Sequence, residues 1–234
     1  MNENLPAYVP AFFILTTLAA VGFLFYAVVN AAGRSSLRYI IPGIVSFWLI
    51  FQASLALSGF YQVTDVLPPR IFAFAAFPAL LFAVACCLFL RNDLISKLPF
   101  AVLTLLHVVR VPVEVTLYWL YEKGQVPEAM TFAGSNFDIL SGITAPVVYY
   151  FAFRNGTFNR PLLLIWNIAA LLLLVNIVGT AILAFPSPLQ SIALDRPNVA
   201  VMYFPFVWLP AVVVPAVFFA HIAALYKLSR PGRA

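Results

Sequence analysis

Three ionisable side chains share one face of an otherwise apolar segment, residues 99–121. His107, Arg110 and Glu114 are spaced i, i+3 and i+7, which places them on one side of an α-helix. A guanidinium can hold an anion or a ligand oxygen, and a carboxyl or an imidazole can take up and release protons. The segment therefore has the residue types needed to bind a small solute or to handle protons.

Two interpretations of this stripe stay open. Arg110 and Glu114 are four residues apart, so they could neutralise one another and pin their helix in a bundle as a structural ion pair. Alternatively, they line a polar cavity, in which Arg110 holds a ligand and Glu114 exchanges a proton. A structural and a functional charge look alike in sequence.

The second histidine lies at a matching depth in another apolar run. His221 is about eight residues before the predicted inner end of the last run, and His107 is about eight residues after the inner start of its own. A haem held between the two imidazoles from opposite sides is one possibility. Zinc is not expected, since there is no third histidine and the two cysteines are adjacent. We therefore predict no metal site and no cofactor, with the haem as the alternative.

Further polar side chains open the next apolar run. Asn136 and Asp138 either cap a helix, where an acidic residue is favoured, or form the outer mouth of a cavity above Glu114. Asn167 and Asn176 point opposite ways on the following helix, so at most one can reach the same cavity. Asn176 is predicted to do so, because it lies nearer the outer side.

The composition tells us which elements must position these groups. The chain has 234 residues, of which 64% are hydrophobic and 9% charged. A soluble domain is near ~45–50% apolar and ~25% charged. This composition excludes a soluble enzyme, a disordered chain and a disulfide-rich secreted scaffold. It predicts an all-α polytopic membrane protein.

Seven apolar runs approach the roughly 20 residues that a membrane-spanning helix needs. Charged, proline or glycine residues separate them, and together they form a single transmembrane domain over residues 1–234. Six spans with a re-entrant fifth segment are the alternative. The seven predicted spans are 10–32, 39–59, 71–90, 99–121, 137–153, 162–185 and 206–228.

The basic residues predict the orientation. With the N-terminus outside and the C-terminus inside, nine Lys and Arg residues fall in inner segments and three in outer ones, which is a clear positive-inside bias. The nine include Arg34, Arg91, Arg154 and Arg233. The net charge of +5 thus records topology and needs no nucleic-acid partner.

A short internal repeat is also visible. The segment 78–83 reads Pro-Ala-Leu-Leu-Phe-Ala, and the segment 215–220 reads Pro-Ala-Val-Phe-Phe-Ala. Both would run from outside to inside. Internal repeats are one way in which transporters build a site near the middle of the membrane.

Four stretches resemble those of uncharacterised bacterial multi-span proteins: 68–70 (Pro-Pro-Arg), 107–114, 136–140 and 204–210. The resemblance runs along most of the chain. It implies the inner membrane of a bacterium and supplies no activity, so no functional residue can be transferred from it.

The sequence therefore favours a small-solute, ion or proton transporter, or a channel-like protein, whose site comprises His107, Arg110, Glu114, Asn136, Asp138, Asn176 and His221. An intramembrane enzyme acting on a lipid or isoprenoid is the first alternative, with unknown catalytic residues. A non-catalytic subunit or sensor of a membrane complex is the second. The expected partners are the lipid bilayer and a small solute or ion, and a homo-oligomer or a membrane partner stays open.

Overall fold

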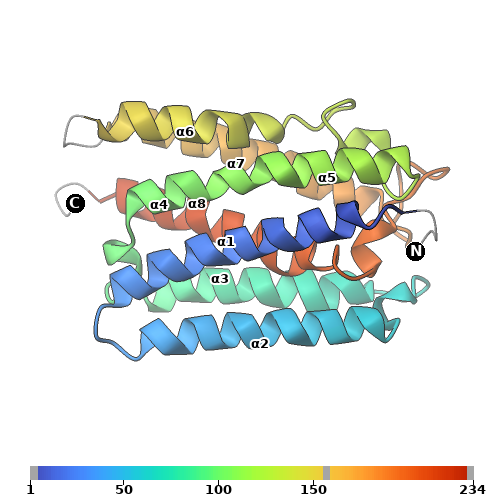
Figure 1. The fold of residues 1–234 in the computed structure, drawn as a ribbon, viewed down its shortest axis with the longest axis horizontal. Helices are drawn as coiled ribbons and strands as arrows, with labels where there is room; N and C mark the ends of the chain where they lie inside the picture. The colour runs from blue at the N-terminus through green and yellow to red at the C-terminus, as the bar shows by residue number, and fades with distance from the viewer. Residues whose placement is uncertain (1–4, 155–158, 231–234) are drawn as a thin grey trace.

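The apolar runs form long helices that lie side by side in one bundle (Figure 1). The computed structural model describes residues 5–154 and 159–230, so Arg233, one of the basic residues assigned to the inner side, lies outside it. All regular secondary structure within these ranges is helical. The prediction of an all-α fold is confirmed.

The main helices are α1 (Tyr8–Ala32), α2 (Leu37–Leu57), α3 (Phe77–Phe89), α4 (Phe100–Leu106), α5 (Arg110–Glu122), α6 (Ile139–Phe153), α7 (Arg160–Leu183) and α8 (Val214–Leu228). Three shorter segments continue them: the π-helical η2 (Phe72–Ala76) before α3, the 3₁₀ turn η4 (His107–Val109) between α4 and α5, and the π-helical η7 (Leu209–Val213) before α8. Single 3₁₀ turns stand in the connections: η1 (Phe60–Gln62), η3 (Ile95–Lys97), η5 (Glu128–Met130) and η6 (Ala200–Met202).

Six helices of the described chain are long and apolar enough to cross a membrane. They are Tyr8–Ala32, Leu37–Leu57, Phe72–Phe89, Phe100–Glu122, Arg160–Leu183 and Leu209–Leu228, each within a few residues of a predicted span. The prediction of seven spanning helices is wrong, because the fifth, α6, has only 15 residues. A membrane protein with six helices of spanning length is what the fold shows.

The segment before α6 explains its short length. Residues 131–138 form no helix, and this stretch has both exposed and buried side chains: Phe137 is 53% exposed, whereas Asn136 has no exposed surface. Irregular backbone at membrane depth is tolerated where protein covers it. The backbone is therefore non-helical before α6, and two of its polar side chains, Asn136 and Asp138, are buried inside the bundle.

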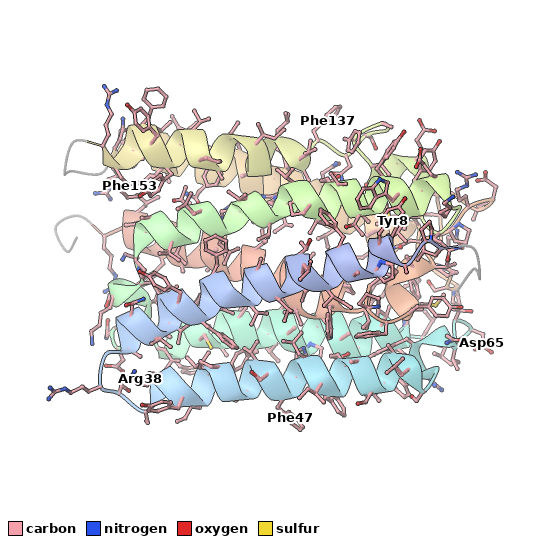
Figure 2. All side chains as sticks on the ribbon, viewed as in Figure 1. Tyr8, Arg38, Phe47, Asp65, Phe137 and Phe153 are labelled. Atoms are coloured by element: carbon pink, nitrogen blue, oxygen red, sulfur yellow. The ribbon has the colours of Figure 1, made fainter. Side chains whose placement is uncertain are left out.

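With α4, η4 and α5 taken as one continuous helix, successive helices run in alternating directions, so that α1 begins and α8 ends at opposite ends of the bundle (Figure 1). α6 packs against α4, η4 and α5 on one side and against α7 on the other, while α8 packs against α3, α4 and α7. Apolar side chains also cover the outside: Phe47 and Phe137 project from the bundle (Figure 2) and are 67% and 53% exposed. An apolar exterior is what a lipid surrounding requires.

Candidate functional site: a buried polar network

Arg110 lies at the centre of a network of polar side chains between α5, α6, α7 and α8. Its guanidinium binds the Asp138 carboxylate through two nitrogens, with Nε donating to Oδ2 at 2.6 Å and Nη2 donating to Oδ1. Nη2 also donates to the carbonyl of Ala170 at 3.0 Å. Arg110 is 2% exposed and Asp138 5%. The buried charge is thus neutralised by a bidentate partner, the geometry in which guanidinium–carboxylate pairs are strongest.

The same guanidinium reaches His221 of α8. Arg110 Nη1 lies 3.2 Å from His221 Nε2, and His221 Nδ1 lies 3.0 Å from Asn167 Oδ1. Because an arginine can only donate, Nε2 must accept, which leaves the imidazole proton on Nδ1 for Asn167. Asn167 in turn donates from Nδ2 to the carbonyl of Leu163 at 2.8 Å. The pattern fits a neutral His221 with one defined tautomer.

His107 stacks on His221, with ring centroids 4.0 Å apart and an angle of 30° between the rings. Trp166 meets the His107 ring edge-on at 5.1 Å. A haem iron ligated from both sides needs two imidazoles whose nitrogens point at each other across the porphyrin, whereas these rings face each other with no space for one. The arrangement does not fit a haem. His107 Nδ1 is buried without a hydrogen-bond partner within the described residues.

Glu114 lies one turn further along α5 and is bound by an amide. Asn136 Nδ2 is 2.7 Å from each carboxyl oxygen of Glu114 and 3.0 Å from the carbonyl of Met130. Asn136 Oδ1 accepts the backbone N–H of Asp138 at 3.0 Å. This side chain therefore connects Glu114 to the residue that neutralises Arg110. Within residues 5–154 and 159–230 the Arg110–Asp138 contact is the one ion pair, so Glu114 forms no ion pair there.

Close approach of α6 to α5 makes these contacts possible. A Cβ atom at Gly142 would stand 2.7 Å from Val111 Cγ2 and 2.8 Å from the Val111 nitrogen. Only glycine permits that separation. The helix carrying the stripe is also irregular here, since the 3₁₀ turn η4 covers His107–Val109 and Pro112 cannot donate a hydrogen bond to the carbonyl of Val108.

The structure brings six of the seven predicted site residues together: His107, Arg110, Glu114, Asn136, Asp138 and His221. Asn176 does not join them. Its side chain is exposed and donates to the carbonyl of Ser135 at 3.2 Å. The choice between the two asparagines of α7 was wrong, because Asn167 is the one in the network.

Depth in the bundle would have identified Asn167. Its helix starts at Arg160, α4 starts at Phe100 and α8 ends at Leu228, all at the same end of the bundle. Asn167, His107 and His221 thus each lie seven residues from that end. Trp166, which donates from Nε1 to Thr144 Oγ1 at 2.9 Å, is a second residue that sequence reasoning missed.

The network holds two chemically different parts. Around Arg110 every charge is compensated, and in the described residues no three His, Cys, Asp or Glu side chains come together as a metal site would need. Around Glu114 a carboxyl is enclosed with an amide as its partner, and Glu114 is 1% exposed. The first part is suited to holding four helices together. The second part is suited to gaining and losing a proton.

The fold and the site thus define a helical membrane protein with a sealed polar network in its interior. The chain belongs to the family of a domain of unknown function, DUF8737, whose model matches residues 67–229. That range contains the whole network and confirms the expected membership of an uncharacterised family. Comparisons with curated proteins and with solved structures gave no match.

Proposed function

We propose that this protein moves protons across a membrane, either alone or coupled to a small solute, and that Glu114 is the group that carries the proton. The observation behind the proposal is that Glu114 is enclosed in the bundle with an asparagine amide as its hydrogen-bond partner and forms no ion pair within the described residues, since the nearby Arg110 guanidinium is bound to Asp138. An isolated carboxylate is expensive inside a membrane, whereas a carboxyl that takes up and releases a proton is a common element of proton pathways.

The degree of enclosure favours protons over larger molecules. Glu114 and His107 are each 1% exposed, and His221 and Asn136 have no exposed surface. A lipid or isoprenoid substrate could not reach an acid–base pair made of Glu114 and His107 without opening the bundle. A proton needs only hydrogen-bonded groups and small rearrangements. Transport therefore accounts for the geometry better than intramembrane catalysis.

The proposal includes an orientation and a location. The positive-inside bias supports an outer N-terminus and an inner C-terminus, and the ends of α1 and α8 at opposite ends of the bundle are consistent with it (Figure 1). Residues 131–153 together would then make the fifth crossing. The inner membrane of a bacterium is the location that the resemblance implied.

Purified protein in phosphatidylcholine liposomes, loaded with a pH-sensitive dye, tests the proposal. With a potassium diffusion potential imposed through valinomycin, we expect the wild-type protein to acidify the lumen faster than protein-free liposomes do. If reconstituted, correctly folded protein gave only the protein-free rate under imposed potential and under an imposed pH gradient, unaided proton movement would be excluded. Repeating the assay with candidate solutes on one side then tests coupled transport.

A further inference from the structure

The two copies of the internal repeat are built alike. Each proline follows a π-helical segment, Pro78 after η2 and Pro215 after η7. In a regular helix the N–H at these positions would bond to the carbonyls of Phe74 and Ala211, four residues earlier. Proline has no N–H, so both carbonyls need another donor.

Helix α2 supplies both donors. Gln52 Nε2 donates to the carbonyl of Phe74 at 2.9 Å, and Trp48 Nε1 donates to the carbonyl of Ala211 at 3.0 Å. Gln52 and Trp48 are one turn apart, so one face of α2 satisfies both copies of the repeat. As a result, neither carbonyl is left to bind a polar ligand.

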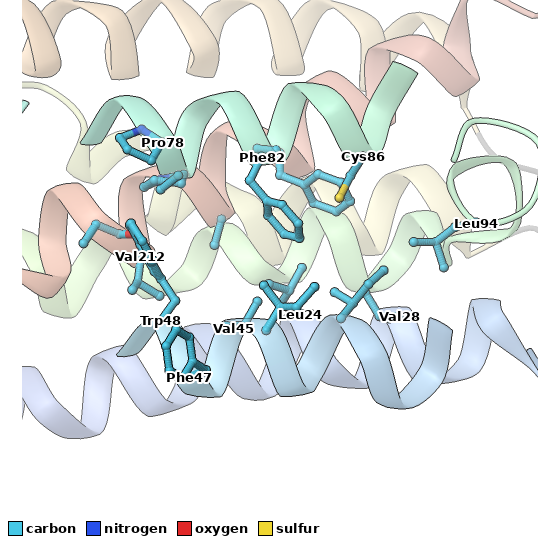
Figure 3. Close-up of a pocket in the computed structure, with 18 residues that line it drawn as sticks. Leu24, Val28, Val45, Phe47, Trp48, Pro78, Phe82, Cys86, Leu94 and Val212 are labelled. Atoms are coloured by element: carbon cyan, nitrogen blue, oxygen red, sulfur yellow. The ribbon is translucent and has the colours of Figure 1, made fainter. Parts of the chain in front are cut away.

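A cavity of about 380 Å³ lies where the repeat copies face α2 (Figure 3). The same positions of the two copies line it, namely Pro78, Ala79 and Phe82 from one copy and Pro215, Ala216 and Phe219 from the other. Phe47 and Trp48 of α2 stand opposite them, and Leu94 lies at one end (Figure 3). Ligand cavities typically measure ~300–1,000 Å³. The lining is apolar throughout, and the Trp48 N–H is already bonded.

The cavity is open toward the surroundings of the bundle. α2 packs on α1 and α3 packs on α8, while α2 and α3 make hardly any direct contact. At this gap Ile44 and Phe47 are 44% and 67% exposed. These residues belong to a helix of spanning length, so in a membrane the opening would face hydrocarbon.

We propose that this cavity binds one hydrocarbon chain of a membrane lipid, which enters sideways between α2 and α3 while the headgroup stays outside. The apolar lining, in which the Trp48 N–H is already hydrogen-bonded, favours a hydrocarbon ligand. Because the cavity is open on the side of the bundle, that ligand can enter directly from the bilayer. None of Arg110, Glu114 and His221 lines the cavity. The site is therefore distinct from the polar network and does not depend on proton transport.

Photolabelling tests this directly. The full-length protein is reconstituted in phosphatidylcholine nanodiscs that contain a phosphatidylcholine with a diazirine in its acyl chain, and adducts are mapped by mass spectrometry after irradiation. We expect adducts on Ala79, Val212 and Ala216, which are 9%, 5% and 3% exposed, in addition to the outward-facing Phe77 and Leu81. Adducts confined to Phe77, Leu81 and other outward-facing residues would overturn the proposal.

A filled cavity provides the matched comparison. Ala79→Phe places a ring in the cavity, and we expect it to remove the adducts on Val212 and Ala216 while those on Leu81 persist. Ala85→Phe makes the same change on the same helix outside the lining and should leave both sets of adducts intact. If Ala79→Phe does not fold, the wild-type map still decides. Two copies of the protein in each nanodisc, with Ala79 and Ala216 unlabelled, would assign the cavity to a second copy instead.

Discussion

Arg110 forms its ion pair with Asp138, 28 residues further along the chain, although Glu114 lies one turn away on the same helix. The i,i+4 pair that the sequence allows is thereby replaced by a pair between α5 and the start of α6. This leaves Glu114 without an ion pair within the described residues and ties Asp138, at the end of the irregular segment 131–138, to the bundle interior. The network has one compensated and one uncompensated carboxyl as a result.

The first prediction concerns the energetic coupling of this pair. Arg110→Gln or Asp138→Asn alone leaves a buried charge unpaired and should cost about 3–5 kcal/mol of unfolding free energy. The double variant removes both charges and should recover most of that loss. The unfolding free energies of the wild type, the two single variants and the double variant, measured in mixed detergent micelles by circular dichroism, give this double-mutant cycle. Additive losses in the double variant would show that the two side chains do not depend on one another.

The second prediction concerns the contact between α5 and α6. Gly142→Ala would put a methyl group 2.7 Å from Val111 Cγ2, so α6 must move away and we expect a loss of about 1–3 kcal/mol in the same unfolding assay. Gly179→Ala is the control, because nothing lies within 4 Å of its Cβ position in α7. Equal stability of the two variants would contradict the close packing described here.

The third prediction separates the two asparagines of α7. Asn167→Leu removes the acceptor for His221 Nδ1 and should cost about 1–3 kcal/mol, the usual penalty for a buried group left without its hydrogen bond. Asn176→Leu changes an exposed side chain that contacts only the carbonyl of Ser135 and should change stability little. Thermal unfolding of both variants in detergent checks the order. A larger loss of stability for Asn176→Leu than for Asn167→Leu would contradict the assignment of Asn167 to the buried network.

The fourth prediction is a pH dependence that comes from Tyr61, in the connection after α2. Burial raises the pKa of Tyr61 to about 12, and its hydroxyl donates to Gln52 Oε1. An unfolded tyrosine ionises near pH 10. Between these values the unfolded chain loses the proton and the folded chain keeps it, so stability falls as the pH rises.

The difference in unfolding free energy between the wild type and Tyr61→Phe isolates this contribution. We expect the difference to be constant below about pH 9 and to shift in favour of Tyr61→Phe as the pH rises above about 10, where tyrosine begins to ionise. A difference that stays flat up to pH 12 would mean that Tyr61 is not enclosed as described. The ionisation of the other tyrosines contributes equally to both proteins and so cancels in the difference of their unfolding free energies.

The sequence was a good guide to the helices and a partial one to the site. The length of the apolar runs predicted six helices within a few residues, because hydrocarbon thickness leaves little freedom. Helical spacing correctly placed His107, Arg110 and Glu114 in the bundle interior, since the face that a residue occupies is set by its own helix. The sequence prediction counted the short fifth run, 137–153, as a span, whereas α6 covers only Ile139–Phe153.

The spacing of residues in the sequence does not predict which carboxylate forms the ion pair with Arg110. Arg110 could be assigned to Glu114 or to another carboxyl, and only the position of α6, set by Gly142, decides for Asp138. The sequence favours Asn176 over Asn167 because Asn176 lies nearer the outer side, but the residue it would have to reach, His221, lies at the depth of Asn167. The matching depth of His107 and His221 likewise says nothing about the angle between their rings, which are stacked and do not fit a haem.

Proton flux through the Glu114→Gln variant tests the central claim most directly. Glutamine keeps the size of the side chain and cannot carry the proton, while Glu122→Gln makes the same change at an exposed position near the end of α5. In dye-loaded liposomes under a potassium diffusion potential, we expect Glu114→Gln to fall to the protein-free rate and Glu122→Gln to match the wild type. Wild-type flux through a folded Glu114→Gln protein would contradict the proposed role of Glu114.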